Sequence, residues 1–370
     1  MPKITGVSLF EVRLPLRHEF ETSSHRKTSL THILVALQDG AGNTGWGEIA
    51  SPADPFFCAE TNDTAWLIAE KYFAKQLVGV EFETPHELEK NWAKIRGNEF
   101  VKSGFSIAGW DLLAKAAGVS LAAALGGERE RVQAGVSLGI ETSIDALLTE
   151  VEKHVAAGYE RVKLKIAPGW DLEPTRAVRV AFPAVDVHVD ANAVYEPGEA
   201  AFALFKQLDK LELTMFEQPF AQRDFLSHAE LQKRVATPVC LDESVVSLDD
   251  LRLAHALNAI GVLNIKVSRM GGLTVARAAH DFAVEVGIPV WCGGMHEFGI
   301  GRAANVALST LPGFTLPSDV SASEKYYRED IIDPVVTATG GMVTVPSGAG
   351  IGHAVREQMV RDLALRVLEV

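Results

Sequence analysis

The stretch Arg161-Val162-Lys163-Leu164-Lys165-Ile166 is followed directly by Ala167-Pro168-Gly169. A short aliphatic run that ends at Pro and Gly is typical of a β-strand. Because side chains alternate between the faces of a strand, we expect Lys163 and Lys165 to share one face. Two ammonium groups about 6.7 Å apart repel by roughly 2.5 kcal/mol at an effective dielectric of about 20, which would lower their pKa values. A solvated edge strand could also carry such a pair, so this stretch alone leaves both interpretations open.

The composition is that of an ordinary soluble globular chain, with 370 residues, 47% hydrophobic and 22% charged. The net charge of −13 has no basic tract to offset it, which argues against nucleic acid or an anionic membrane surface as a partner. The three cysteines, Cys58, Cys240 and Cys292, indicate a reducing compartment rather than a disulfide framework. The first residues lack the apolar core of a signal peptide, and no apolar run is long enough to cross a membrane. We therefore expect a cytoplasmic protein.

Residues 1–127 are predicted to form an α+β domain that begins as a β-meander. The expected strands and helices are 3–13, 28–37 and 44–49, then 60–76, 85–96 and 101–117. The last helix is expected to stop at Ala117-Gly118. The polar stretch 18–27 is either a solvated loop or a lid over a site, and the sequence leaves both open.

From residue 128 to about 325, short apolar strands alternate with amphipathic helices. The eight strand candidates are 132–139, 161–166, 186–190, 214–218, 238–243, 262–267, 289–292 and 314–318. This alternation is typical of parallel βα units, and eight of them favour a closed TIM-like barrel. The remaining segment, 326–370, is predicted to end in a helix at 355–368 and to pack on the N-terminal domain.

Five successive strands of this barrel end in a residue that catalysis commonly uses. At intervals of about 25 residues these are Lys165, Asp190, Glu217, Asp242 and Lys266. One βα unit per interval places all five at the C-terminal rim of the barrel, where the active sites of such barrels lie. A single acid here could instead cap the following helix, but five in register favour a shared site.

The three carboxylates would repel one another unless a cation lay among them. Oxygen ligands of this kind suit Mg²⁺, with Mn²⁺ as a substitute. Zn²⁺ is less expected, because none of these positions holds a Cys or a His. A metal between two lysines can bind a substrate carboxylate and stabilise the enediolate that forms when the α-proton is removed. A lysine with a lowered pKa would be the base.

These residues resemble the enolase superfamily and its muconate-lactonizing-enzyme subgroup. The motifs that carry the resemblance are Lys163-Leu-Lys165, Asp190-Ala-Asn192, Glu217-Gln-Pro219, Asp242-Glu-Ser244 and Lys266-Val-Ser-Arg269. The resemblance implies an α/β fold, a (β/α)7β barrel at 128–325 with a capping domain built from 1–127 and 326–370. It also implies that Asp190, Glu217 and Asp242 bind Mg²⁺ and that Lys165 and Lys266 are acid/base groups on opposite faces of the substrate. Lys163, Asn192 and Glu243 would support them, with Lys163 also near the substrate carboxylate.

Within this subgroup the chain is most similar to the o-succinylbenzoate synthase/N-succinylamino acid racemase family. The likeness lies in Val136-Ser137-Leu-Gly-Ile140, Trp291-Cys-Gly-Gly294-Met295, Gly299-Ile-Gly-Arg302 and Leu316-Pro-Ser-Asp319. It implies dehydration to o-succinylbenzoate in menaquinone synthesis, together with racemisation of N-succinylamino acids. The expected substrate-pocket residues are Ser137, Gly294, Met295 and His296. Arg269 resembles a residue of racemase-competent members, or else forms a salt bridge at the start of the next helix.

Two residues depart from the family pattern, His296 and Phe298, and both are expected to face the substrate after the seventh strand. His188 shares the face of Asp190 and is expected to pack inside the barrel. The enzymatic alternatives are a dipeptide epimerase, against which the absence of an Asp-x-Asp motif after the eighth strand argues, and a muconate cycloisomerase. A binding protein on a degenerate barrel is the alternative outside enzymes. The expected partner is a small-molecule carboxylate, and we expect a homo-oligomer.

Overall fold

The structure is a computed structural model that describes residues 1–21 and 26–370. Its N-terminal part is a four-stranded antiparallel sheet in the order β16-β1-β2-β3, formed by β1 (Ile4–Glu21), β2 (Arg26–Asp39), β3 (Thr44–Ile49) and β16 (Ala364–Glu369). The polar stretch 18–27 is partly strand, because β1 and β2 extend into it. Its centre, 22–25, lies outside the described residues.

The C-terminal prediction was wrong in one respect. The expected helix at 355–368 is only α13 (Glu357–Leu363), and the chain then pairs with β1 as the edge strand β16. Leu365 and Val367 are exposed there, so their hydrophobicity does not mark a buried helix face. Pairing with an edge of another part of the chain has outweighed the local pattern.

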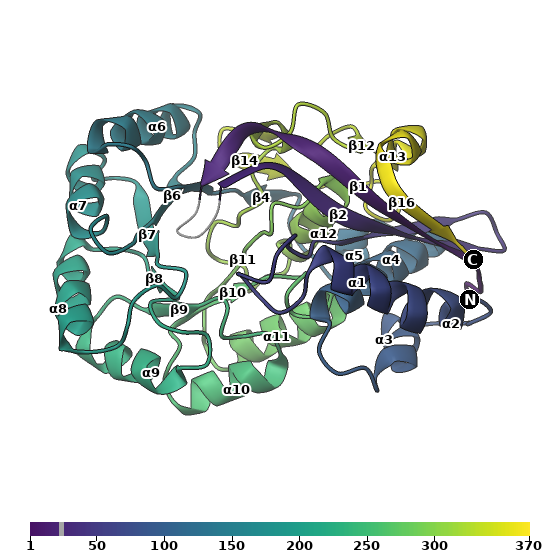
Figure 1. Ribbon diagram of the computed structural model, residues 1–370, viewed down its shortest axis with the longest axis horizontal. Helices are drawn as coiled ribbons and strands as arrows, with labels where there is room; N and C mark the ends of the chain where they lie inside the picture. Colours follow the sequence, from purple (N-terminus) through teal and green to yellow (C-terminus); the bar gives the residue numbers. More distant parts are fainter. Residues whose placement is uncertain (22–25) are drawn as a thin grey trace.

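The helices that cover this sheet lie close to the three predicted ranges, except that the second ends at residue 92 and that α5 was not predicted. They are α1 (Asn62–Ala69), η1 (Glu70–Ala74), α2 (Lys75–Leu77), α3 (Pro85–Glu89), η2 (Lys90–Trp92), α4 (Glu99–Ala117) and α5 (Leu121–Leu125). As predicted, α4 stops at Gly118, which adopts a left-handed conformation. α4 packs tightly on β3, since a Cβ atom on Gly47 would overlap the carbonyl oxygen of Gly104. Figure 1 shows these helices and both chain termini at one end of the molecule.

The second part is a parallel sheet of seven strands in unbroken sequence order from β5 to β11. Its strands are β5 (Val136–Leu138), β6 (Arg161–Lys165), β7 (Asp186–Asp190), β8 (Phe216–Glu217), β9 (Val239–Leu241), β10 (Val262–Ile265) and β11 (Val290–Cys292). The sheet curls, with helices on its outer face (Figure 1): α6 (Ile144–Ala156), α7 (Leu172–Ala181), α8 (Glu199–Leu208), α9 (Phe225–Arg234), α10 (Leu248–Ala256), α11 (Leu273–Glu285) and α12 (Gly299–Leu308).

The expected closed barrel of eight strands is not what the hydrogen-bonded sheet shows, because the sheet is an open half-barrel. The eighth candidate, 314–318, makes only isolated parallel bridges, from Phe314 to Val290 and from Ser318 to Ala134. Pro317 interrupts this segment and has no amide hydrogen for a ladder. The first candidate is split, since β4 (Arg131–Gln133) leaves the parallel sheet and pairs with β14 (Met342–Thr344).

The remaining short elements lie in the C-terminal segment. They are η4 (Ser323–Lys325), β12 (Ile332–Asp333), β13 (Ala338–Thr339), β14 and β15 (Ala354–Val355), with η3 (Asp209–Leu211) earlier in the chain. Among the described residues, no helix is both long enough and apolar enough to cross a membrane.

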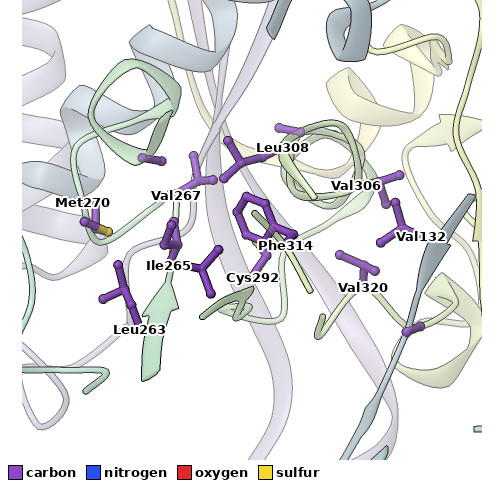
Figure 2. Packing of buried hydrophobic residues seen from close by; sticks show 14 of the residues in the cluster. Val132, Leu263, Ile265, Val267, Met270, Cys292, Val306, Leu308, Phe314 and Val320 are labelled. Atoms are coloured by element: carbon purple, nitrogen blue, oxygen red, sulfur yellow. The ribbon is translucent and has the colours of Figure 1, made fainter. Parts of the chain in front are cut away.

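Strand alternation determines which side chains enter the core. On β10, Leu263 and Ile265 pack into the hydrophobic cluster, together with Met270 and Phe314 (Figure 2). The alternate residue, Asn264, therefore lies on the other face of the sheet, and its amide contacts the carboxylate of Glu217. The same alternation on β6 places Val162 and Leu164 in the cluster and both lysines on the opposite face, as predicted.

Candidate active site

A cavity of about 400 Å³ lies at the C-terminal ends of the parallel strands. Its lining includes Lys163, Lys165 and Lys266 from the strands and Leu30, Pro52 and Phe57 from the N-terminal part. The four expected pocket residues, Ser137, Gly294, Met295 and His296, also line it, as do Asn192 and Glu243. The strand ends therefore bring the two expected bases to one cavity.

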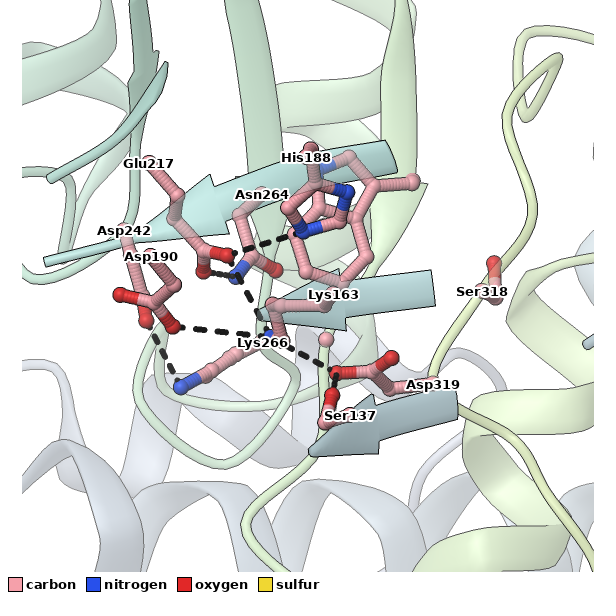
Figure 3. Close-up of polar contacts among 12 residues, drawn as sticks. Ser137, Lys163, His188, Asp190, Glu217, Asp242, Asn264, Lys266, Ser318 and Asp319 are labelled. Atoms are coloured by element: carbon pink, nitrogen blue, oxygen red, sulfur yellow. Dashed lines mark hydrogen bonds and ion pairs between the residues drawn. The ribbon is translucent and has the colours of Figure 1, made fainter. Parts of the chain in front are cut away.

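The end of β6 holds two lysines among buried carboxylates. Lys165 Nζ lies 2.5 Å from Asp190 Oδ2 and 2.5 Å from Asn192 Oδ1, so its ammonium is held by two acceptors. Lys163 Nζ lies 3.3 Å from Glu217 Oε2 and 3.7 Å from Asp190 Oδ2. Figure 3 shows Lys163 in the middle of this group.

The expected lowering of the pKa is wrong for Lys163. Burial alone would lower its pKa, but three surrounding carboxylates, Asp319, Glu217 and Asp190, raise it overall above its usual value. The pattern within this one strand indicates the repulsion from Lys165 but not these acids, which come from other parts of the chain. The surrounding carboxylates therefore favour the charged form of Lys163.

The three expected metal ligands end neighbouring strands and are all buried. Glu217 Oε1 accepts a hydrogen bond from Asn264 Nδ2 at 2.8 Å, and His188 Nε2 lies 3.4 Å from Glu217 Oε2. Burial would raise the pKa of Glu217, but Lys163 and His188 hold it well below its usual value. Glu217 is therefore a carboxylate.

Asp242 lies at the end of β9 and faces the Lys266 side of the cavity (Figure 3). Lys266 Nζ is 2.8 Å from Asp242 Oδ2, and Arg269 pairs with Asp242 Oδ1. Burial lowers the pKa of Arg269 to about 9. Arg269 was expected to resemble a residue of racemase-competent members or to form a salt bridge at the start of the next helix. It does form a salt bridge, with Asp242, and it lies just before α11, which begins at Leu273.

These carboxylates fit a hard cation in their chemistry. Glu217 Oε2 and both oxygens of Asp242 are buried, and their close contacts are ion pairs with Lys163, Lys266 and Arg269. Anionic carboxylate oxygens are the ligands that Mg²⁺ prefers. Yet in the described part of the chain no group of three or more Asp, Glu, His or Cys side chains is arranged to hold a metal ion. Lysine and arginine side chains lie among the carboxylates instead.

Arg161 and Asp319 also belong to the charged group around Lys163, although no role in the site was predicted for either of them. Asp319 lies 2.8 Å from Arg161 Nη1 and 2.9 Å from Lys163 Nζ, and it accepts a hydrogen bond from Ser137 Oγ at 3.1 Å. Burial would raise the pKa of Asp319, but the two cations hold it well below its usual value. The alternation that grouped Lys163 with Lys165 also places Arg161 on their face, so this signal was available.

His188 and the two residues that depart from the family pattern occupy different environments. His188 is buried beside Trp291, as expected for interior packing, and burial lowers its pKa to about 4. His296 lines the cavity, with its ring 4.9 Å from that of Tyr326. Phe298 does not face the substrate as expected. It is fully buried and stacks on His32 between the two parts of the molecule.

A curled parallel sheet with lysines and carboxylates at its rim, beside an α+β domain, defines an enolase-type enzyme class. The chain belongs to the mandelate racemase/muconate lactonizing enzyme family of the enolase superfamily. Residues 4–126 match the N-terminal domain of that family, and residues 146–359 match the enolase C-terminal domain-like family.

Similar proteins of known name cover nearly the whole chain. The o-succinylbenzoate synthase of Bacillus subtilis is 40% identical over 99% of this chain and 98% of its own. The N-succinylamino acid racemase of Thermus thermophilus is 42% identical over 98% of each chain. The crystal structure of an enolase superfamily member from Listeria innocua superposes with a TM-score of 0.97 at 35% identity, covering 100% of this chain and 99% of that one.

Proposed function

We propose that this chain is an o-succinylbenzoate synthase that also racemises N-succinylamino acids. Relatives with these two names, at about 40% identity over the full chain, support both activities. The observation that carries the chemistry is that Lys165 and Lys266, from strands four positions apart in the sheet, line the same cavity. Two amines around one substrate can remove and return a proton on opposite faces, as racemisation requires.

The roles of the residues follow from their contacts. Lys165 is oriented by Asp190 and Asn192 and exchanges the proton on one face. Lys266 exchanges it on the other face. Lys163 lines the cavity beside these residues, and we place it near the substrate carboxylate. Asn192 donates to Glu243 at 3.0 Å, which keeps its amide oxygen turned toward Lys165.

Asp190, Glu217 and Asp242 would hold Mg²⁺, with Mn²⁺ as a substitute. The support is their burial at the ends of neighbouring strands and the anionic character of Glu217, whose pKa lies well below its usual value. When bound, the metal supplies positive charge that lowers the cost of removing a proton α to a carboxylate. We expect a chelator to abolish turnover and added Mg²⁺ to restore it.

We further infer that the segment 314–318 completes a (β/α)7β barrel, since its bridges reach both β11 and the residues just before β5. The proposed division is a capping domain at 1–127, a catalytic barrel at 128–325 and a returning segment at 326–370. The pairing of β16 with β1 supports the return. A cytoplasmic homo-oligomer without nucleic-acid or membrane partners remains our expectation.

The alternatives make different demands on the site. A dipeptide epimerase would need acids after the eighth strand, but Asp319 there is held by Arg161 and Lys163. A muconate cycloisomerase remains compatible with the same lysines and carboxylates. A binding protein on a degenerate barrel would give no turnover at all.

Two assays on one preparation separate these functions. Ultraviolet absorbance follows dehydration to o-succinylbenzoate, and polarimetry follows racemisation of an N-succinylamino acid, each with Mg²⁺ present. We expect both activities, and both should fall at least about a hundredfold in Lys165→Ala. An exposed control, Lys153→Gln, should keep both. Turnover of a dipeptide or of a muconate instead would replace the proposal with that alternative.

A further inference from the structure

Four cationic side chains, Lys163, Lys165, Lys266 and Arg302, line the cavity. The three lysines each pair with a carboxylate at 2.5 to 2.9 Å. Within the described part of the chain, no carboxylate pairs with Arg302. Its positive charge therefore remains available to a ligand.

Arg302 is fixed in place by backbone carbonyls. It lies on α12, is 2% exposed, and donates to Ser321 O at 2.8 Å and to Glu297 O at 3.0 Å. No described residue accepts a hydrogen bond from its buried Nε. The guanidinium carbon lies 4.9 Å from the centre of the Tyr326 ring. Neutral acceptors hold this group without cancelling its charge, and burying an unpaired charge is costly.

A second unpaired cation lies on the same ring. Lys325 Nζ is 5.4 Å from the centre of Tyr326 and donates to Ser137 O at 3.1 Å, and within the described chain it too has no carboxylate partner. Tyr326 lines the cavity, and its hydroxyl makes no hydrogen bond to any described residue. Arg302 and Tyr326 thus meet at one wall of the cavity, and Lys325 lies against the Tyr326 ring.

This wall is connected to the lysines at the strand ends. Ser137, which receives the Lys325 hydrogen bond on its carbonyl, donates from its own hydroxyl to Asp319, and Asp319 pairs with Lys163. A substrate held by one end at the lysines could therefore extend along this wall. A succinyl group carries its second carboxylate at the far end of a short flexible chain.

We propose that Tyr326, Lys325 and Arg302 form the subsite for the distal carboxylate of a dicarboxylate substrate. The Tyr326 hydroxyl donates a hydrogen bond to that carboxylate, and the two cations behind the ring supply the charge. The inference rests on the proposed function and deepens it, since it explains how a succinyl group is chosen over an uncharged acyl group. These are binding and specificity residues, not acid/base groups.

The test compares two substrates of the same shape: an N-succinylamino acid and its terminal amide, the N-succinamoylamino acid. We expect the native chain to favour the acid in kcat/KM. Tyr326→Phe and Lys325→Gln should each reduce that preference about tenfold, through KM rather than kcat. The first removes a charge-assisted hydrogen bond, and the second removes one of the two positive charges behind the ring. The control Lys233→Gln removes an exposed lysine on α9 and should keep the native preference.

Calorimetric binding of both compounds to the same variants makes the test independent of turnover. A chain that binds the acid tightly but does not turn it over would refute the proposed function and keep the subsite. Equal losses for the acid and the amide in both variants would overturn the subsite. So would a native chain that shows no preference between the two compounds.

Discussion

Glu48 joins the two parts of the molecule through a single buried carboxylate. It lies on β3, is fully buried, and accepts hydrogen bonds from the backbone of Phe298 and Gly301, both at 2.7 Å. These two amides belong to the first turn of α12. His32 Nδ1 lies 2.6 Å from the same carboxylate. The loop that α12 follows, 293–298, carries the cavity residues Gly294, Met295 and His296.

Glu48→Gln keeps the shape of this side chain and removes its charge. One of its two acceptor atoms becomes an amide nitrogen, so at least one donor loses its partner: Gly301 if Oε2 is replaced, or Phe298 and His32 if Oε1 is replaced. Losing a charged hydrogen bond costs about 1.5 to 3 kcal/mol, and leaving a buried donor unsatisfied costs about 1 to 3 kcal/mol. Losing the favourable interaction between a negative charge and the N-terminus of α12 costs roughly 0.3 to 1 kcal/mol more. These contributions overlap, so we expect the free energy of unfolding to fall by about 3 to 5 kcal/mol.

Urea unfolding of Glu48→Gln beside Glu83→Gln measures this loss. Glu83 is an exposed glutamate of the N-terminal part, and its substitution should change the free energy of unfolding by less than about 0.5 kcal/mol. In Glu48→Gln the KM should also rise, because the 293–298 loop loses its anchor. A loss of less than about 1 kcal/mol with native KM would refute the idea that this carboxylate holds the loop in place.

Two further predictions concern pH. Because the pKa of Asp319 is lowered in the folded chain, its carboxylate stabilises the fold at neutral pH, and this contribution declines below about pH 4. Asp319→Asn should therefore cost about 3 to 5 kcal/mol at pH 7 and progressively less in acid, as measured by urea unfolding at a series of pH values. Burial and the nearby Glu99 raise the pKa of Glu60 to about 7, at the N-terminus of α4. Because this pKa is raised, Glu60 contributes to the free energy of unfolding below about pH 4, and this contribution is lost as the pH rises to 7. Glu60→Gln should therefore flatten the pH dependence of the free energy of unfolding between these values. An identical profile in the variant would contradict the assignment.

The sequence predicted what depends on local pattern. The two-residue period of β6 grouped its lysines, and the spacing of the βα units placed five strand-end residues at one rim. Both follow from geometry that a few residues determine. The final strand β16 was missed because its partner, β1, lies at the other end of the chain.

The sequence also did not indicate which carboxylates compensate the charge of a buried lysine. The pKa of Lys163 depends on carboxylates from three other parts of the chain, and one of them, Asp319, lies more than 150 residues away in sequence. The burial of Phe298 likewise results from contact with His32 on β2. Long-range neighbours of this kind have no signature in a local pattern.

Proton exchange in D₂O tests the central claim, that Lys165 and Lys266 act on opposite faces of one substrate. Each enantiomer of an N-succinylamino acid is incubated separately with the native chain, Lys165→Ala or Lys266→Ala, and deuterium at the α-carbon is followed by NMR. We expect the native chain to label both enantiomers and to racemise them. Each single variant should label one enantiomer only, a different one in each case, without racemisation. Full racemisation by either variant, or labelling of the same enantiomer by both, would contradict the account.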